Sequence, residues 1–107
     1  VDERFAGMHA VHTNNNLCLI VFGLKLAEGD LMRGLSQTVA MGLDSDCTAA
    51  SAGSILGAVL GKSAIAPELY ECFHDRMDTY LKNTEAFSIR DMAKRYSALA
   101  HKVHSRL

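Results

Sequence analysis

Small residues recur at every fourth position in the middle of the chain, at Ala49, Gly53, Gly57 and Gly61. In a helix this spacing places them on one face. A glycine inside a helix costs about 1 kcal/mol relative to alanine, so three of them require a compensating interaction. We therefore expect a helix over about residues 46–61 whose small face lets neighbouring helices approach closely.

The rest of the chain also shows helical periodicity. Apolar residues recur at intervals of three and four, and no segment alternates polar and apolar residues as a half-buried strand does. Asp30 and Ser88 favour the first position of a helix, and Pro67 fits a first turn. Helices are predicted over residues 17–27, 31–41, 46–61, 67–81 and 89–103. The fold class is therefore predicted to be all-α, a compact bundle of about five helices that forms a single helical domain over residues 1–107.

Composition argues against two classes of partner. The chain carries 11 Lys and Arg residues against 12 Asp and Glu residues, so it lacks the basic excess typical of nucleic-acid binding. The longest apolar run, residues 17–24, is far too short to span a membrane. We therefore expect neither a nucleic acid nor a membrane as partner.

The three cysteines, Cys18, Cys47 and Cys72, form no CxxC pair and are odd in number. This pattern predicts free thiols, as in a cytoplasmic protein, and neither a disulfide framework nor a zinc site. The chain begins at Val1 and shows no signal-peptide pattern, which is expected of a processed start or of a fragment.

Two carboxylates precede the predicted small-faced helix, at Asp44 and Asp46. Residues i and i+2 of a turn can point at one ion, and the helix N-terminus would orient and partly neutralise them. Hard oxygen ligands of this kind suit Mg²⁺. The alternative is structural: an aspartate that caps the helix and a second one that is solvated.

The neighbouring Cys47 and the histidines are weaker candidates. A nucleophilic Cys47 would need a base, which the sequence does not nominate, and the two aspartates oppose a lowered thiol pKa. His12 is predicted either to face a polar site and bind substrate or to serve a turn or cap. His101 and His104 lie in a basic tail that complements a helix C-terminus.

The order of these motifs resembles the ADP-ribosylglycohydrolase family. The resemblance covers roughly residues 9–95 and rests on the segments 42–47, 53–61 and 65–69, which read GLDSDC, GSILGAVLG and IAPEL. Upstream, HTNNN before an apolar helix and EGD before the next helix also resemble family members.

This resemblance implies an all-α domain with a binuclear Mg²⁺ site that cleaves the bond between ADP-ribose and an acceptor. It assigns Asp44 and Asp46 as metal ligands. Cys47 stands where the family commonly has a threonine whose hydroxyl also binds metal, and a thiol is a poor ligand for Mg²⁺. The family's further acidic cluster lies in an N-terminal portion of the domain. The resemblance therefore implies a C-terminal fragment that is inactive alone and needs that missing portion of the same protein.

Two alternatives follow from the same residues. The first is that the chain is a non-catalytic helical scaffold or binding module descended from this family, as Cys47 and the short length suggest. Half a domain would also leave apolar surface uncovered, which favours a homo-oligomer. The expected small-molecule partner is an ADP-ribosylated substrate or an ADP-ribose-like compound.

Overall fold

The computed structural model describes residue 1 and residues 3–106, and the chain divides into two units, Val1–Ile65 and Ala66–Leu107. The first unit holds the helices α1 (Thr13–Ala27), α2 (Leu31–Ala40) and α3 (Ser45–Leu60), followed by the short turn η1 (Lys62–Ala64). The second unit ends in the helix α4 (Ile89–His104). Helices dominate both units, and the predicted all-α fold class is confirmed.

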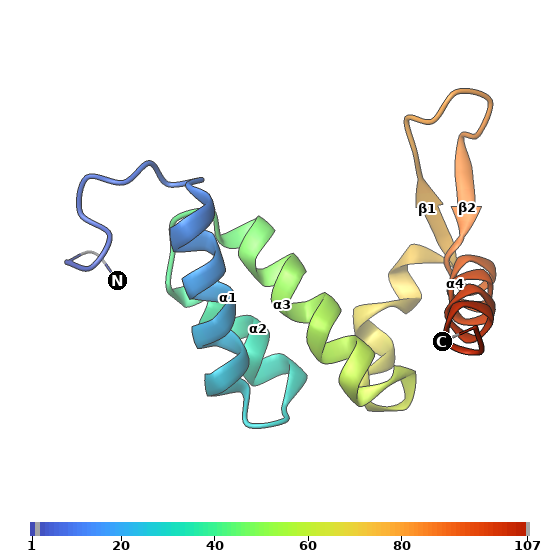
Figure 1. The fold of residues 1–107 in the computed structure, drawn as a ribbon, viewed down its shortest axis with the longest axis horizontal. Coiled ribbons are helices and arrows are strands. Elements are labelled where there is room, and N and C mark those ends of the chain that lie inside the picture. The colour runs from blue at the N-terminus through green and yellow to red at the C-terminus, as the bar shows by residue number, and fades with distance from the viewer. Residues whose placement is uncertain (2, 107) are drawn as a thin grey trace. The chain divides into compact units, whose positions relative to one another are not determined.

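The three helices of the first unit pack against one another in every pairing, as Figure 1 shows. Their core is small and built from short side chains. Its apolar members are Phe5, Leu19, Ala27, Leu31, Ala49, Ala52 and Leu56. Three polar residues, Asn15, Thr38 and Thr48, are completely buried with them. Of these three, Thr48 donates hydrogen bonds to the backbone at the start of α3, where the candidate site lies.

The closest helix contacts are made by glycines outside the predicted small face. A Cβ on Gly23 of α1 would overlap the Thr38 Oγ1 of α2. A Cβ on Gly34 would lie 2.5 Å from Leu56 Cδ1 and 2.8 Å from Ala27 Cβ. The sequence pattern did not indicate either glycine, because the residue that leaves no room for a Cβ lies on another helix.

On α3 itself, the predicted close approach of a neighbouring helix is found at one glycine. A Cβ on Gly53 would lie 2.9 Å from Leu35 Cδ2, so close contact explains that glycine. At Gly57 the nearest atom, Ile65 Cδ1, would be 3.9 Å away, an ordinary contact. Gly61 ends the helix with φ +76°. The expectation of close packing is therefore wrong at Gly57 and Gly61.

Predicted helix starts agree with the structure where a local cap defines them. Asp30 Oδ1 accepts a hydrogen bond of 2.7 Å from Arg33 N at the start of α2. Ser88 Oγ accepts one of 3.0 Å from Asp91 N at the start of α4. The first helix begins at Thr13, four residues before the predicted residue 17, because His12 supplies the cap.

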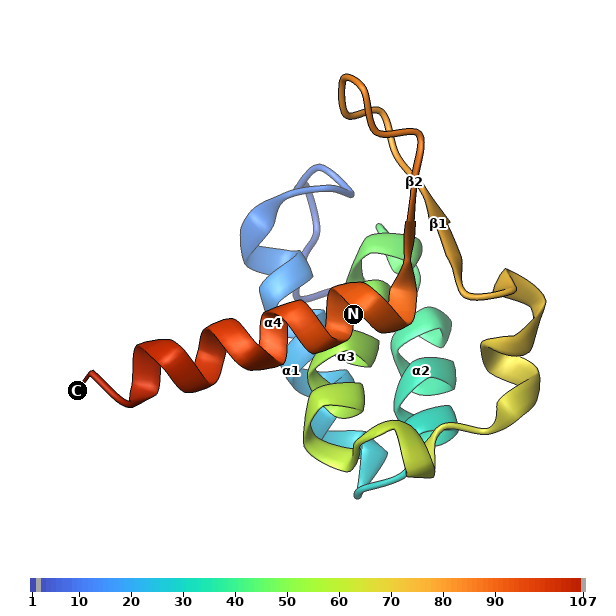
Figure 2. The same ribbon diagram turned by 90° about the vertical axis from the view of Figure 1, so that its right-hand side faces the viewer.

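The predicted helix over residues 67–81 is wrong. The segment forms two short turns, η2 (Pro67–Leu69) and η3 (Glu71–Phe73), followed by the strand β1 (Arg76–Asp78). That strand pairs antiparallel with β2 (Ala86–Ser88), with Met77 opposite Phe87, and the hairpin leads into α4 (Figure 2). The sequence pattern predicted no strand, so this hairpin also contradicts that expectation.

The physical reason is a lack of packing. Most stability of a short helix comes from burying its apolar face. Here the residues that gave the segment its helical period stay exposed, among them Phe73, Met77, Tyr80 and Leu81. His74 and Asp75 take left-handed conformations with φ of 50° and 58°, which interrupt any helix between η3 and β1. In the described part of the chain, no helix is long and apolar enough to cross a membrane.

Candidate metal centre

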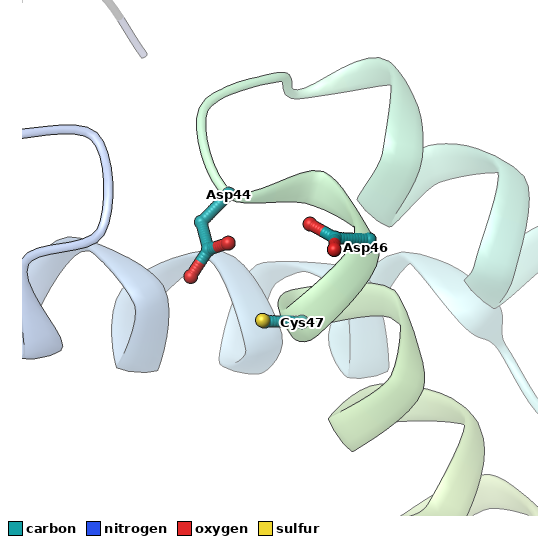
Figure 3. A group of neighbouring side chains, drawn as sticks. All are labelled: Asp44, Asp46 and Cys47. Atoms are coloured by element: carbon teal, nitrogen blue, oxygen red, sulfur yellow. The ribbon is translucent and has the colours of Figure 1, made fainter.

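Asp44, Asp46 and Cys47, here called the Asp44 cluster, bring their side chains together where α3 begins. One ligand atom from each lies within 4.8 Å of the others. Figure 3 shows Asp44 on the loop before α3 and the other two residues in the first helical turn. Asp44 is half-buried, whereas Asp46 and Cys47 are exposed. The two sequence-predicted carboxylates are thus adjacent and open to a ligand from solvent.

The backbone of Asp44 is held by its surroundings on both sides. Gly42 and Leu43 before it have left-handed φ angles of 74° and 58°, which turn the chain sharply out of α2. After it, the buried Thr48 donates from Oγ1 to Asp44 O at 3.1 Å and to Ser45 O at 3.3 Å. Thr48 N also donates to Asp44 O at 3.0 Å. These bonds place Asp44 at the N-cap position of α3.

The Asp44 carboxylate does not cap the helix that it precedes. It makes no side-chain capping bond to α3. Instead its Oδ2 accepts a hydrogen bond of 2.5 Å from Asn16 Nδ2 on α1, a residue 28 positions away in sequence. The structural alternative for Asp44, a simple capping aspartate, therefore does not describe what its side chain does. Asn16 was not among the predicted site residues, because nothing in the segment HTNNN indicates its contact with a residue 28 positions away.

The thiol of Cys47 is electrostatically unsuited to ionise. A hydrogen bond with Asp44 raises the pKa of Cys47, and the negative charges of Asp44 and Asp46 raise it further. Because the thiolate is both the nucleophile and the metal ligand, Cys47 is a poor candidate for either role near neutral pH. The direction agrees with the expectation that the aspartates oppose a lowered pKa.

The donor set can be compared with what a hard divalent cation requires. Mg²⁺ prefers carboxylate and water oxygens in octahedral geometry. The carboxylates of Asp44 and Asp46 fit this requirement, and the protonated sulfur of Cys47 does not. The orphaned Oδ1 of Asn16, which is buried without a hydrogen-bond partner, adds an uncommitted oxygen on a residue that touches Asp44.

The histidines do not join this cluster as a shared ligand set. His12 is the N-cap of α1, and its Nδ1 accepts a 3.2 Å hydrogen bond from Asn14 N. His9 Nδ1 similarly accepts from Val11 N at 3.3 Å. The N–H of Asn16 donates to the carbonyl of His12 at 3.1 Å, so His12 lies one helical turn before the residue that contacts Asp44. A capping role for His12 is observed directly.

The histidines of the second unit, His101 and His104, lie in the last turn of α4 with Lys102. Basic side chains in that position complement the negative end of the helix dipole, as expected. The cysteines Cys18, Cys47 and Cys72 are all free in this structure.

Comparison with known proteins identifies a family. A family model described as ADP-ribosylglycohydrolase matches residues 2–105. No curated protein and no solved structure matches significantly. The match covers nearly the whole chain, includes the Asp44 cluster and supports a hydrolase of ADP-ribose linkages in general. The chain belongs to the ADP-ribosylglycohydrolase family.

Proposed function

We propose that this chain is part of a Mg²⁺-dependent hydrolase that cleaves the glycosidic bond between ADP-ribose and an acceptor. The observation that carries the proposal is the placement of Asp44. Its carboxylate is held by Asn16, 28 residues away, beside a second carboxylate from Asp46. A family match over residues 2–105 supplies the reaction class.

In this proposal Asp44 and Asp46 hold the cation through their carboxylate oxygens. A bound Mg²⁺ would supply Lewis-acid chemistry that polarises ribose hydroxyls or water. The chain's own contribution is orientation: Asn16 and Thr48 fix Asp44 from its two ends, so little reorganisation accompanies binding. The positive end of the α3 dipole lies at the same place and partly offsets the repulsion between the two carboxylates.

His12 is the residue that we propose for substrate binding. Its Nδ1 is committed as an acceptor to Asn14 N, so in the neutral ring Nε2 carries the proton and can donate. It precedes Asn16 by one turn on α1. A donor in this position suits a hydroxyl or phosphate oxygen of an ADP-ribose-like ligand.

The number of ligands argues that the isolated chain is inactive. A binuclear site needs more oxygen donors than two carboxylates provide, even with bound water. We propose that the remaining ligands come from an N-terminal portion of the same protein. The three free cysteines support a reducing compartment such as the cytoplasm.

The activity test uses a protein that includes that portion, with Mg²⁺ and an ADP-ribosylated substrate. Asp44→Asn and Asp46→Asn are compared with Glu68→Gln, which neutralises a carboxylate on η2, outside the Asp44 cluster. We expect both cluster variants to lose turnover and the control to keep it. Equal turnover in all three proteins would contradict the metal role of the two aspartates.

A second candidate is a non-catalytic binding module. Cys47 favours it, because it stands where the family pattern has a metal-binding hydroxyl and a thiol is a poor ligand for Mg²⁺. Calorimetry with ADP-ribose separates the two candidates, because a binding module retains the ligand without turnover.

Sedimentation at rising concentration tests for a homo-oligomer, which the exposed Leu17, Val21 and Phe22 on α1 favour.

A further inference from the structure

The contact between Asn16 and Asp44 joins two helices at the candidate site. Asn16 lies in the first turns of α1 and Asp44 at the start of α3. The bond from Asn16 Nδ2 to Asp44 Oδ2 is 2.5 Å long and partly buried. A short bond between an amide and a carboxylate in this setting is charge-assisted and directional. It therefore restricts the rotation of the Asp44 carboxylate.

The oxygen of the Asn16 amide makes no hydrogen bond. This atom, Oδ1, is buried. A buried amide oxygen without a partner is unfavourable, and Asn15 Oδ1 is in the same situation. What distinguishes Asn16 is the bond from its Nδ2 to Asp44.

The neighbouring asparagine has a different task. Asn15 is completely buried, and its Nδ2 donates to the carbonyls of His9 at 3.1 Å and Ala10 at 3.4 Å. It thereby holds the segment before α1 against the helix. Asn14, by contrast, is exposed. Of these three consecutive amides, only Asn16 has a recorded side-chain bond to the Asp44 cluster.

We propose that Asn16 is a positioning residue for the cation held by Asp44. It acts through the Asp44 carboxylate: its amide binds Oδ2 and thereby restricts how that carboxylate turns toward a cation shared with Asp46. This inference rests on the proposed function. A partner that orients a ligating carboxylate affects metal affinity by roughly 10- to 100-fold.

The experiment measures Mn²⁺ binding by the protein that includes the N-terminal portion, using water-proton relaxation with Mn²⁺ alone as the probe. Asn16→Leu removes the donor at similar size, and Asn16→Ser replaces it with a hydroxyl too short to reach Asp44. The matched controls are Asn14→Leu and Asn14→Ser on the exposed face of the same helix turn. We expect both Asn16 variants to lose at least about tenfold in Mn²⁺ affinity and both controls to keep it.

A double-variant cycle separates positioning from a general structural effect. In an Asp44→Asn background, Asn16→Leu should cause no further loss of Mn²⁺ affinity, because the group through which it acts is gone. Additive losses would overturn the inference. Circular dichroism checks that the helices persist, and if Asn16→Leu unfolds them, the Asn16→Ser cycle gives the decisive result.

The outcomes distinguish this inference from the proposed function. If the wild type binds Mn²⁺ and the Asn16 variants bind it with the same affinity, only the positioning role is overturned. If the unsubstituted protein that includes the N-terminal portion binds no Mn²⁺, the metal site and the positioning role are overturned together.

Discussion

Asp44 lies beside Cys47 and raises the pKa of its thiol through a hydrogen bond and through its charge. The thiol is exposed, so its reactivity reports on the state of the Asp44 carboxylate without any metal or substrate. This relationship gives the most direct test of the geometry at the start of α3.

Asp44→Asn should make Cys47 more reactive. The substitution removes the principal cause of the raised pKa and leaves the smaller effect of the Asp46 charge. We expect the rate of iodoacetamide alkylation at pH 8 to rise severalfold, because the thiolate is the reactive form. Asp46→Asn should give a smaller rise. Peptide mass spectrometry follows each thiol, and the exposed Cys72 serves as an internal reference. An unchanged rate at Cys47 would contradict the contact with Asp44.

Two glycine substitutions should change stability in opposite directions. Gly23→Ala places a methyl group on the Thr38 Oγ1 and should lower the free energy of unfolding by about 1–3 kcal/mol. The nearest atom to a Cβ on Gly57 is Ile65 Cδ1, at 3.9 Å. Gly57→Ala should therefore raise the free energy of unfolding by up to about 1 kcal/mol, because alanine has the higher helix propensity. Urea unfolding followed by circular dichroism measures both. The pair is matched in chemistry, so a loss of stability in both variants would show that the contacts on α3 are tighter than described.

Thr48→Val should weaken the start of α3. The side chain is completely buried and nearly isosteric with valine, so the change removes chiefly the hydroxyl that donates to the carbonyls of Asp44 and Ser45. We expect a loss of about 1 kcal/mol in the free energy of unfolding. Ser54→Ala is the control, because that hydroxyl makes the same kind of bond to Ala50 O on the exposed side of the helix. Chemical denaturation of the two variants gives the comparison, and equal losses would refute a special role for Thr48.

The parts of the fold that the sequence predicted correctly depend on local chemistry. Asp30 and Ser88 cap helices by bonding to the backbone three residues on, so their effect can be read from a short stretch of chain. The carboxylates of Asp44 and Asp46 were likewise recognisable because both belong to one turn. A family resemblance then added their proposed role as ligands.

The parts that it missed depend on contacts between distant segments. The bond from Asn16 to Asp44 exists only because α1 packs on α3, and no pattern within either helix encodes it. Gly23 is small because of Thr38, which is on another helix. In residues 67–81 the helical period was present, but the structure gives that apolar face nothing to pack against, so turns and a strand form instead.

The second unit offers a prediction about pH. The carboxylate of Asp75 accepts hydrogen bonds from Ser88 Oγ at 2.7 Å and from Arg90 N at 2.8 Å. These bonds, with the positive charges of Arg90 and Lys94, hold the pKa of Asp75 below its ordinary value of 3.8. Asp75 thereby fastens the hairpin to the N-terminus of α4, where a negative charge is favourable.

Because the folded-state pKa of Asp75 is depressed, its contribution to stability is present above pH 3.8 and is lost as the pH falls through the lower, folded-state pKa. Asp75→Asn should therefore weaken the hairpin and α4 at pH 7, and its difference from wild type should shrink in acid. Amide exchange of Arg90 and Asp91, followed by NMR from pH 7 downward, measures this. Asp78→Asn is the control, since its exposed ion pair with Arg76 contributes little. A difference that stayed constant down to pH 2 would show that the charge of Asp75 does not stabilise this junction.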